Sequence, residues 1–192
     1  MNNNFLILDT TYDSSFAVVY ANGQVFFSRS DTEKGKTSER VIPFIEDSLK
    51  MANITKNDLK YIFAVVGPGS FTGIRIGVSI VSAISYGLNI KKASLTVFDG
   101  LGKMQDYKMI PSRRDYFYYS YNDQMGEVSV NDLPDIKILS KYTDVGNTVP
   151  DDVYAQKLSL KALTLIQNGF NEDVLTPLYL KKSQAERLKE GK

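Results

Sequence analysis

Histidine and cysteine are both absent from the 192-residue sequence, and this limits the chemistry that its side chains can perform. Ser-His-Asp triads, Cys-His nucleophiles and the usual zinc sites all need one of these residues. Carboxylate-based acid–base or metal chemistry is what the remaining residue types allow, and no convincing acid–base pair stands out. We therefore expect no catalytic residue, no metal site and no cofactor of the chain's own.

The stretch GPGSFTGIRIG, from Gly67 to Gly77, joins two apolar runs. The run Tyr61 to Val66 is short and rich in β-branched and aromatic residues, which favours a buried strand, and Val78 to Leu88 is long enough for a helix. Gly67, Pro68 and Gly69 favour a sharp turn, and Ser70 is a suitable N-cap, so free amide groups there could bind an anion. The glycine spacing fits neither the dinucleotide fingerprint nor the P-loop.

The predicted helix is unusual because Arg75 is its only charged residue between Ser70 and Asn89. Gly73 and Gly77 lie four residues apart on one face, and each costs about 1 kcal/mol relative to alanine. A closely packed neighbour would offset this cost, and it could be the chain's own sheet or a helix of a partner protein. A membrane span is a third interpretation, against which the glycines and serines count.

The same eleven residues resemble the signature of the TsaB (YeaZ) family, whose members are non-catalytic partners of the transferase TsaD. Pro177 to Glu186 is similar to the closing segment of that family, whereas Thr37 stands where relatives usually have histidine. The resemblance implies an α/β fold of the ribonuclease-H-like, actin-like (ASKHA) class, with two subdomains that each hold a mixed sheet flanked by helices. We expect residues 1–100 to form the partner-binding subdomain and residues 101–192 a reduced second one.

Two short segments resemble the phosphate motifs of the actin-like superfamily. Asp9-Thr10-Thr11 follows the apolar run Phe5 to Leu8, at the place where relatives in that superfamily hold Mg²⁺ and phosphate. The segment from Asp144 to Thr148 resembles the second motif. Both also suit ordinary turns, in which Asp and Thr bond their own backbone. Asp9, Thr10 and Thr11 are therefore only weak nucleotide or magnesium candidates.

The resemblance implies a scaffold subunit of the machinery that makes N6-threonylcarbamoyladenosine next to the tRNA anticodon. It would bind a TsaD-like protein as a heterodimer, act with a TsaE-like ATPase, and meet tRNA only within the complex, with ATP and metal on the partner subunits. Alone, it could form a homodimer. The alternative is a free-standing actin-like nucleotide-binding ATPase or kinase.

In the family the partner binds through the two N-terminal helices. The first is predicted from Ser38 to about Ala52, with apolar residues spaced for one buried face and Pro43 inside it. The predicted partner-binding residues on the two helices are Ser38, Val41, Ile45, Leu49, Gly73, Arg75, Gly77, Ile80 and Ile84.

The remaining elements follow from local patterns. An Asn22-Gly23 hairpin should join strands 15–20 and 24–28. Further strands are expected at 93–98, 108–111, 115–121 and 136–139. We also expect a short helix capped by Asp99, loop with one short element over 125–135, and a helix over 153–167. The aromatic run Tyr116 to Tyr121 could stack on bases, but it suits a strand better. A formal charge of +1 gives no broad basic field, so strong binding of nucleic acid by the chain alone is not expected. The lack of a signal-peptide pattern favours a cytoplasmic protein without a membrane anchor.

Overall fold

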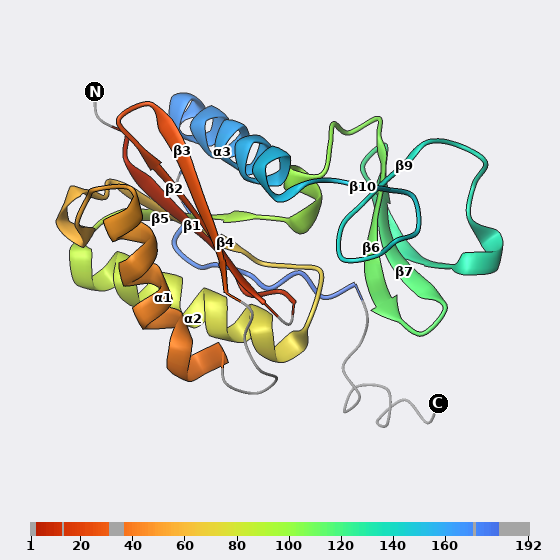
Figure 1. The fold of residues 1–192 in the computed structure, drawn as a ribbon, viewed down its shortest axis with the longest axis horizontal. Helices are drawn as coiled ribbons and strands as arrows, with labels where there is room; N and C mark the ends of the chain where they lie inside the picture. The colour runs from red at the N-terminus through yellow and green to blue at the C-terminus, as the bar shows by residue number, and fades with distance from the viewer. Residues whose placement is uncertain (1–2, 13, 31–36, 171, 181–192) are drawn as a thin grey trace.

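The computed structural model of the protein describes residues 3–12, 14–30, 37–170 and 172–180. Within these residues the chain forms two β-sheets of five strands each, which lie side by side in Figure 1. Sheet A has the order β3-β2-β1-β4-β5. Its strands are β1 (Phe5–Asp9), β2 (Ser15–Ala21), β3 (Gln24–Ser30), β4 (Tyr61–Val65) and β5 (Lys91–Leu95). It is mixed, since β1 pairs antiparallel with β2 and parallel with β4.

Helices cover both faces of sheet A. On one face lie α1 (Thr37–Met51) and α2 (Phe71–Leu88), and on the other lies α3 (Asp151–Asn168) (Figure 1). Every residue of β1 is buried, as expected for a central strand that is covered on both sides. Its side chains alternate, so that Phe5 and Ile7 pack in the apolar layer below α3, whereas Leu6 and Leu8 pack in the layer below α1 and α2.

Sheet B has the order β10-β9-β6-β7-β8 and is smaller. Its strands are β6 (Tyr107–Arg113), β7 (Tyr116–Tyr121), β8 (Gln124–Ser129), β9 (Ile138–Ser140) and β10 (Asn147–Thr148). It is also mixed, because β6 pairs parallel with β9 and antiparallel with β7. Ile110 and Tyr118 join the core below α3, while Met109 and Phe117 belong to a separate cluster on the other face. The predicted α/β class with a reduced second sheet is confirmed.

Two local predictions were wrong. The strand expected at 93–98 ends at Leu95 and is followed by the 3₁₀ helix η2 (Val97–Gly100). Thr96 caps η2, and Asp99 is its N3 residue: the Thr96 amide donates to the Asp99 carboxylate at 2.7 Å. The loop expected after residue 125 contains β8, whose pairing with β7 outweighs the low strand preference of Gly126 and Glu127.

The chain returns to sheet A after completing sheet B. Besides α3, the segment 172–180, here called the closing segment, packs there: Leu175 is buried below α1 and α2, and the Leu178 amide donates to the Val66 carbonyl at 2.8 Å. The expected boundary at residue 100 therefore separates the strands of the two sheets. However, α3 and the closing segment come after this boundary and pack against sheet A. The basic residues from Lys181 onward, and with them the second half of the family-like closing motif, lie outside the described residues.

In the described part of the chain, α2 is the helix whose length and apolar composition would allow a membrane span. In the structure it instead packs with Ile74 and Val81 fully buried against the chain's own sheet. Ser70 caps it as predicted, since its side chain accepts a hydrogen bond from the Gly73 amide at 3.3 Å.

Candidate functional site

Asp9, the predicted phosphate-motif aspartate, lies at the carboxyl end of β1 and is 1% exposed. Its Oδ1 atom accepts hydrogen bonds from the Thr11 amide at 2.9 Å and from the Thr11 hydroxyl at 2.6 Å. These bonds form an ordinary turn in which the aspartate side chain accepts from the following backbone, which was the alternative to a phosphate motif. Its Oδ2 atom accepts a hydrogen bond from the Tyr154 hydroxyl at 2.8 Å, and the Tyr142 hydroxyl lies 3.5 Å from it.

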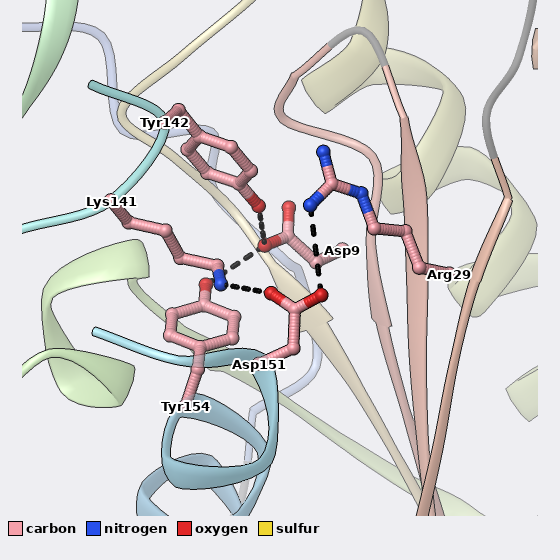
Figure 2. A network of polar contacts seen from close by, with 6 residues as sticks. All are labelled: Asp9, Arg29, Lys141, Tyr142, Asp151 and Tyr154. Carbon is pink, nitrogen blue, oxygen red and sulfur yellow. Dashed lines mark hydrogen bonds and ion pairs between the residues drawn. The ribbon is translucent and has the colours of Figure 1, made fainter. Parts of the chain in front are cut away.

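The side chains around Asp9 come from both parts of the molecule (Figure 2). Lys141 follows β9, and its ammonium group pairs with Asp151, at the start of α3, at 2.6 Å. Arg29 of β3 lies 3.6 Å from the other oxygen of Asp151. The distant hydrogen-bond partners of Asp9, Tyr142 and Tyr154, were not predicted from the sequence, because they lie 133 and 145 residues away along the chain.

Burial raises the pKa of the Asp9 carboxyl above its ordinary value, although the bonds from Thr11 and Tyr154 and the nearby Lys141 ammonium act in the opposite direction. Burial raises the pKa of Tyr154 and of Tyr142 well above the ordinary phenol value, and the Asp9 charge adds to the effect. Both phenols are therefore protonated near neutral pH and can donate to the carboxylate.

This arrangement does not fit the predicted magnesium or nucleotide role of Asp9. Magnesium keeps several water ligands and binds through exposed carboxylate oxygens. Both oxygens of Asp9 already accept hydrogen bonds from the chain itself, and Asp9, Thr10 and Thr11 are all buried. A hydrated ion would have to displace Tyr154, whose hydrogen bond connects the end of β1 to α3.

The glycines of the GPGSFTGIRIG stretch pack against the same turn. A Cβ on Gly73 would overlap the carbonyl oxygen of Thr10 and lie 3.1 Å from its carbonyl carbon, and a Cβ on Gly77 would overlap the Thr10 hydroxyl. The Thr10 hydroxyl donates to the Gly73 carbonyl at 2.7 Å. The expected close neighbour is therefore present, but it belongs to the chain itself. Gly73 and Gly77 are buried against it and give no evidence of a partner helix.

The other predicted partner-binding residues are divided between core and surface. Val41, Ile45 and Leu49 are at most 5% exposed and belong to the core, because the apolar stripe of α1 faces sheet A. Ser38 and Arg75 are exposed, and the half-buried residues Ile80 and Ile84 lie at the edge of the same core. The side chain of Thr37 lies outside the described residues.

The exposed parts of α1 and α2 form a surface of a different composition. A groove of about 320 Å³ runs between the two helices, and its lining is mostly apolar. Its lining residues are Leu6, Ile42, Ile45, Glu46, Leu49, Lys56, Leu59, Ile84, Gly87 and Leu88. Beside it, Arg75, Ser79, Ala83 and Tyr86 form an exposed stripe on α2, here called the α2 outer face. Tyr86 is 91% exposed and Ile42 45%.

The sequence prediction included part of this surface, namely Arg75 on the α2 outer face and Ile45, Leu49 and Ile84 in the groove. It did not include Ser79, Ala83 and Tyr86, although their spacing of three and four residues is the period of one helix face. Of the residues on the α2 outer face, Arg75 and Tyr86 are of the types that are enriched at protein–protein interfaces.

The other two motifs are structural. Rings of the aromatic run stack on their neighbours in sheet B, as between Tyr107 and Tyr119 at a centroid distance of 5.6 Å. Arg113 pairs with Glu127 at 3.3 Å and lies over the Tyr116 ring. In the segment from Asp144 to Thr148, the Thr148 hydroxyl donates to the Thr143 carbonyl, which closes a turn next to β10.

Comparison with known proteins gives matches over the first half of the sequence. Residues 33–108 match the family model of TsaD, tRNA N6-adenosine threonylcarbamoyltransferase. The tRNA threonylcarbamoyladenosine biosynthesis protein TsaB of Buchnera aphidicola (subsp. Schizaphis graminum) is 37% identical over 90 residues, which are 47% of this chain and 42% of that protein. TsaB of Bacillus subtilis is 30% identical over 108 residues, 52% of this chain and 47% of that protein. The matched region is thus less than half of each relative.

Solved structures match over nearly the whole chain. A Pseudomonas aeruginosa protein described as similar to the peptidase YeaZ has a TM-score of 0.71 at 18% identity, covering 93% of this chain and 100% of that one. YeaZ from Pseudomonas aeruginosa has a TM-score of 0.67, also at 18% identity. At such identities the likeness establishes the fold.

Two mixed sheets flanked by helices, joined at the end of β1, define an α/β protein of the actin-like, ribonuclease-H-like class. The sequence matches in the first half give a finer assignment. The first half of the chain is similar in sequence to TsaB proteins, so the resemblance carried by GPGSFTGIRIG is confirmed.

Proposed function

We propose that the protein is a non-catalytic scaffold subunit of a complex that makes N6-threonylcarbamoyladenosine in tRNA. In this proposal it binds a TsaD-like transferase as a heterodimer and works with a TsaE-like ATPase. ATP and metal belong to those partners, and tRNA meets the protein only within the complex. The protein acts in the cytoplasm, without a membrane, and can form a homodimer when isolated.

The observation that carries the proposal is the apolar groove beside the α2 outer face. Arg75 is the only charged residue of α2, so a partner helix laid against this face has few charges to desolvate. Ser79 and Ala83 allow close approach, while Tyr86 and Ile42 are exposed anchors of the kind that contribute most to binding. The names of the relatives, which refer to threonylcarbamoyladenosine biosynthesis, support a partner from the same biosynthesis.

The proposal is tested by deleting the gene in its own host and quantifying the nucleosides of bulk tRNA by mass spectrometry. We expect threonylcarbamoyladenosine to fall to background and to return when the gene is supplied on a plasmid. Normal levels in the deletion strain, with no second TsaB-like gene in the genome, would contradict the assignment.

The second candidate function, an actin-like ATPase or kinase, is favoured by the position of Asp9 at the end of β1. Against it, the carboxylate is bonded by Thr11 and Tyr154. We expect the isolated protein to show no ATP turnover above background, and calorimetry to give no heat of ATP–Mg²⁺ binding. Turnover that is lost in Asp9→Ala, and retained in the exposed-site control Asp47→Ala, would establish this alternative instead.

A further inference from the structure

Lys141 is a buried cation at the joint between the two sheets. Its side chain is 3% exposed, and its ammonium nitrogen lies 2.6 Å from Asp151. The same nitrogen lies 4.4 Å from the ring centre of Tyr154, 5.3 Å from that of Tyr142 and 5.5 Å from that of Phe16. The group is therefore held in a cage of three aromatic rings and a carboxylate.

The residues that surround this ammonium come from different parts of the chain. Asp9 and Phe16 belong to the strands of sheet A, whereas Lys141 and Tyr142 follow β9 of sheet B. Asp151 and Tyr154 lie in the first turn of α3 (Figure 2). A second contact lies beside the cage, where the rings of Tyr12 and Tyr142 stack at a centroid distance of 4.1 Å. The Tyr12 hydroxyl also donates to the carbonyl of Pro111 in β6.

A buried ammonium group is costly unless it is paired and surrounded by groups that replace water. Asp151 supplies the charge, and the ring faces supply cation–π attraction, which is strongest where water is excluded. Because these partners are brought together only when sheet B lies against the end of β1, their interaction energy depends on the relative position of the two sheets. An apolar side chain of the same length would fill the space of Lys141, but its packing energy would depend less on the relative position of the two sheets.

We propose that the caged ammonium group of Lys141 is a clasp that fixes sheet B against the carboxyl ends of the strands of sheet A. This inference does not rest on the proposed function. Lys141 is a positioning residue and not a catalytic one. Its removal should therefore change the distance and orientation of sheet B relative to sheet A.

The test uses the full-length protein, whose lack of cysteine makes site-specific labelling simple. Spin labels on Lys50→Cys and Lys137→Cys, exposed positions on α1 and just before β9, report the distance between the two units. We expect a single narrow distance distribution for the parent and a broadened, longer one for Lys141→Met. We also expect the melting temperature of Lys141→Met to fall by about 10 °C. Lys161→Met, at an exposed lysine paired with Asp99 at 3.7 Å, is the matched control and should behave as the parent does.

A chemical rescue separates the cation from simple packing. Lys141→Ala should regain the narrow distribution and most of the lost melting temperature when butylammonium chloride is added, but not with sodium chloride at the same ionic strength. Asp151→Asn removes the charge that pairs with the ammonium group and keeps the shape of the side chain, so it should also broaden the distribution. If the Lys141 variants do not fold, a parent-like distribution in Asp151→Asn would overturn the clasp. A parent-like distribution in Lys141→Met, or equal rescue by both salts, would overturn it as well.

Discussion

Replacing Gly73 with alanine should cost the protein more than about 3 kcal/mol of folding free energy, enough to leave much of it unfolded. The added Cβ would overlap the Thr10 carbonyl oxygen, a backbone atom at the end of β1 that cannot rotate away. The same helix turn also receives the hydroxyl of Thr10. Equilibrium unfolding in urea, followed by circular dichroism, measures the loss.

The matched control for this variant is Gly87→Ala in the same helix. A Cβ on Gly87 has no neighbour within 4 Å, so the change should stabilise the fold by about 0.5–1 kcal/mol through helix propensity alone. The two substitutions are chemically identical, and opposite signs would locate the cause in the contact with Thr10. If Gly73→Ala instead unfolds at the urea concentration of the parent, the packing of α2 on β1 described above is incorrect.

Replacing Ala83 with arginine should weaken binding of the proposed TsaD-like partner by roughly 100-fold or more, a free-energy change of about 3 kcal/mol. The position is exposed in the middle of the α2 outer face, so a long charged side chain fits the free protein without strain but occupies the space of a partner helix. The melting temperature should stay within about 2 °C of the parent. Isothermal titration with the purified partner gives the affinity.

Leu160→Arg provides the control for that experiment, because Leu160 is an exposed apolar residue, at 64%, on α3. Helix α3 covers the other face of sheet A, away from the groove (Figure 1). The affinity of the Leu160→Arg variant for the partner should equal that of the parent protein. Should Ala83→Arg bind normally while Leu160→Arg binds weakly, the partner surface belongs on α3 and the proposed interface is wrong.

The first sheet could be predicted from the sequence because its signals are local. The Asn22-Gly23 turn has the positive φ values, 51° and 83°, that the dipeptide favours. Ser70 caps α2, and the apolar spacing of α1 correctly identified its buried face. Strand β8 was missed because Gly126 is a poor strand former on its own. A Cβ there would lie 3.0 Å from the ring of Tyr119, so the glycine is explained by its neighbour on β7.

The candidate site was less predictable, since it depends on contacts between distant residues. The position of Asp9 at a strand end followed from the sequence, but its bond to Tyr154 spans 145 residues and leaves no local pattern. Likewise, the cost of two helical glycines correctly implied a close neighbour. Only the structure identifies that neighbour as Thr10 of the chain itself.

The closing segment has a consequence for how the protein is made on the ribosome. Leu175 lies in the apolar layer between sheet A and helices α1 and α2. The Leu178 amide donates a hydrogen bond to the carbonyl of Val66, the residue that follows β4. The strands of sheet A emerge early in synthesis, yet their core lacks these side chains until the last described segment has left the exit tunnel. A nascent chain arrested before residue 172 therefore exposes apolar surface and is a natural client of holding chaperones.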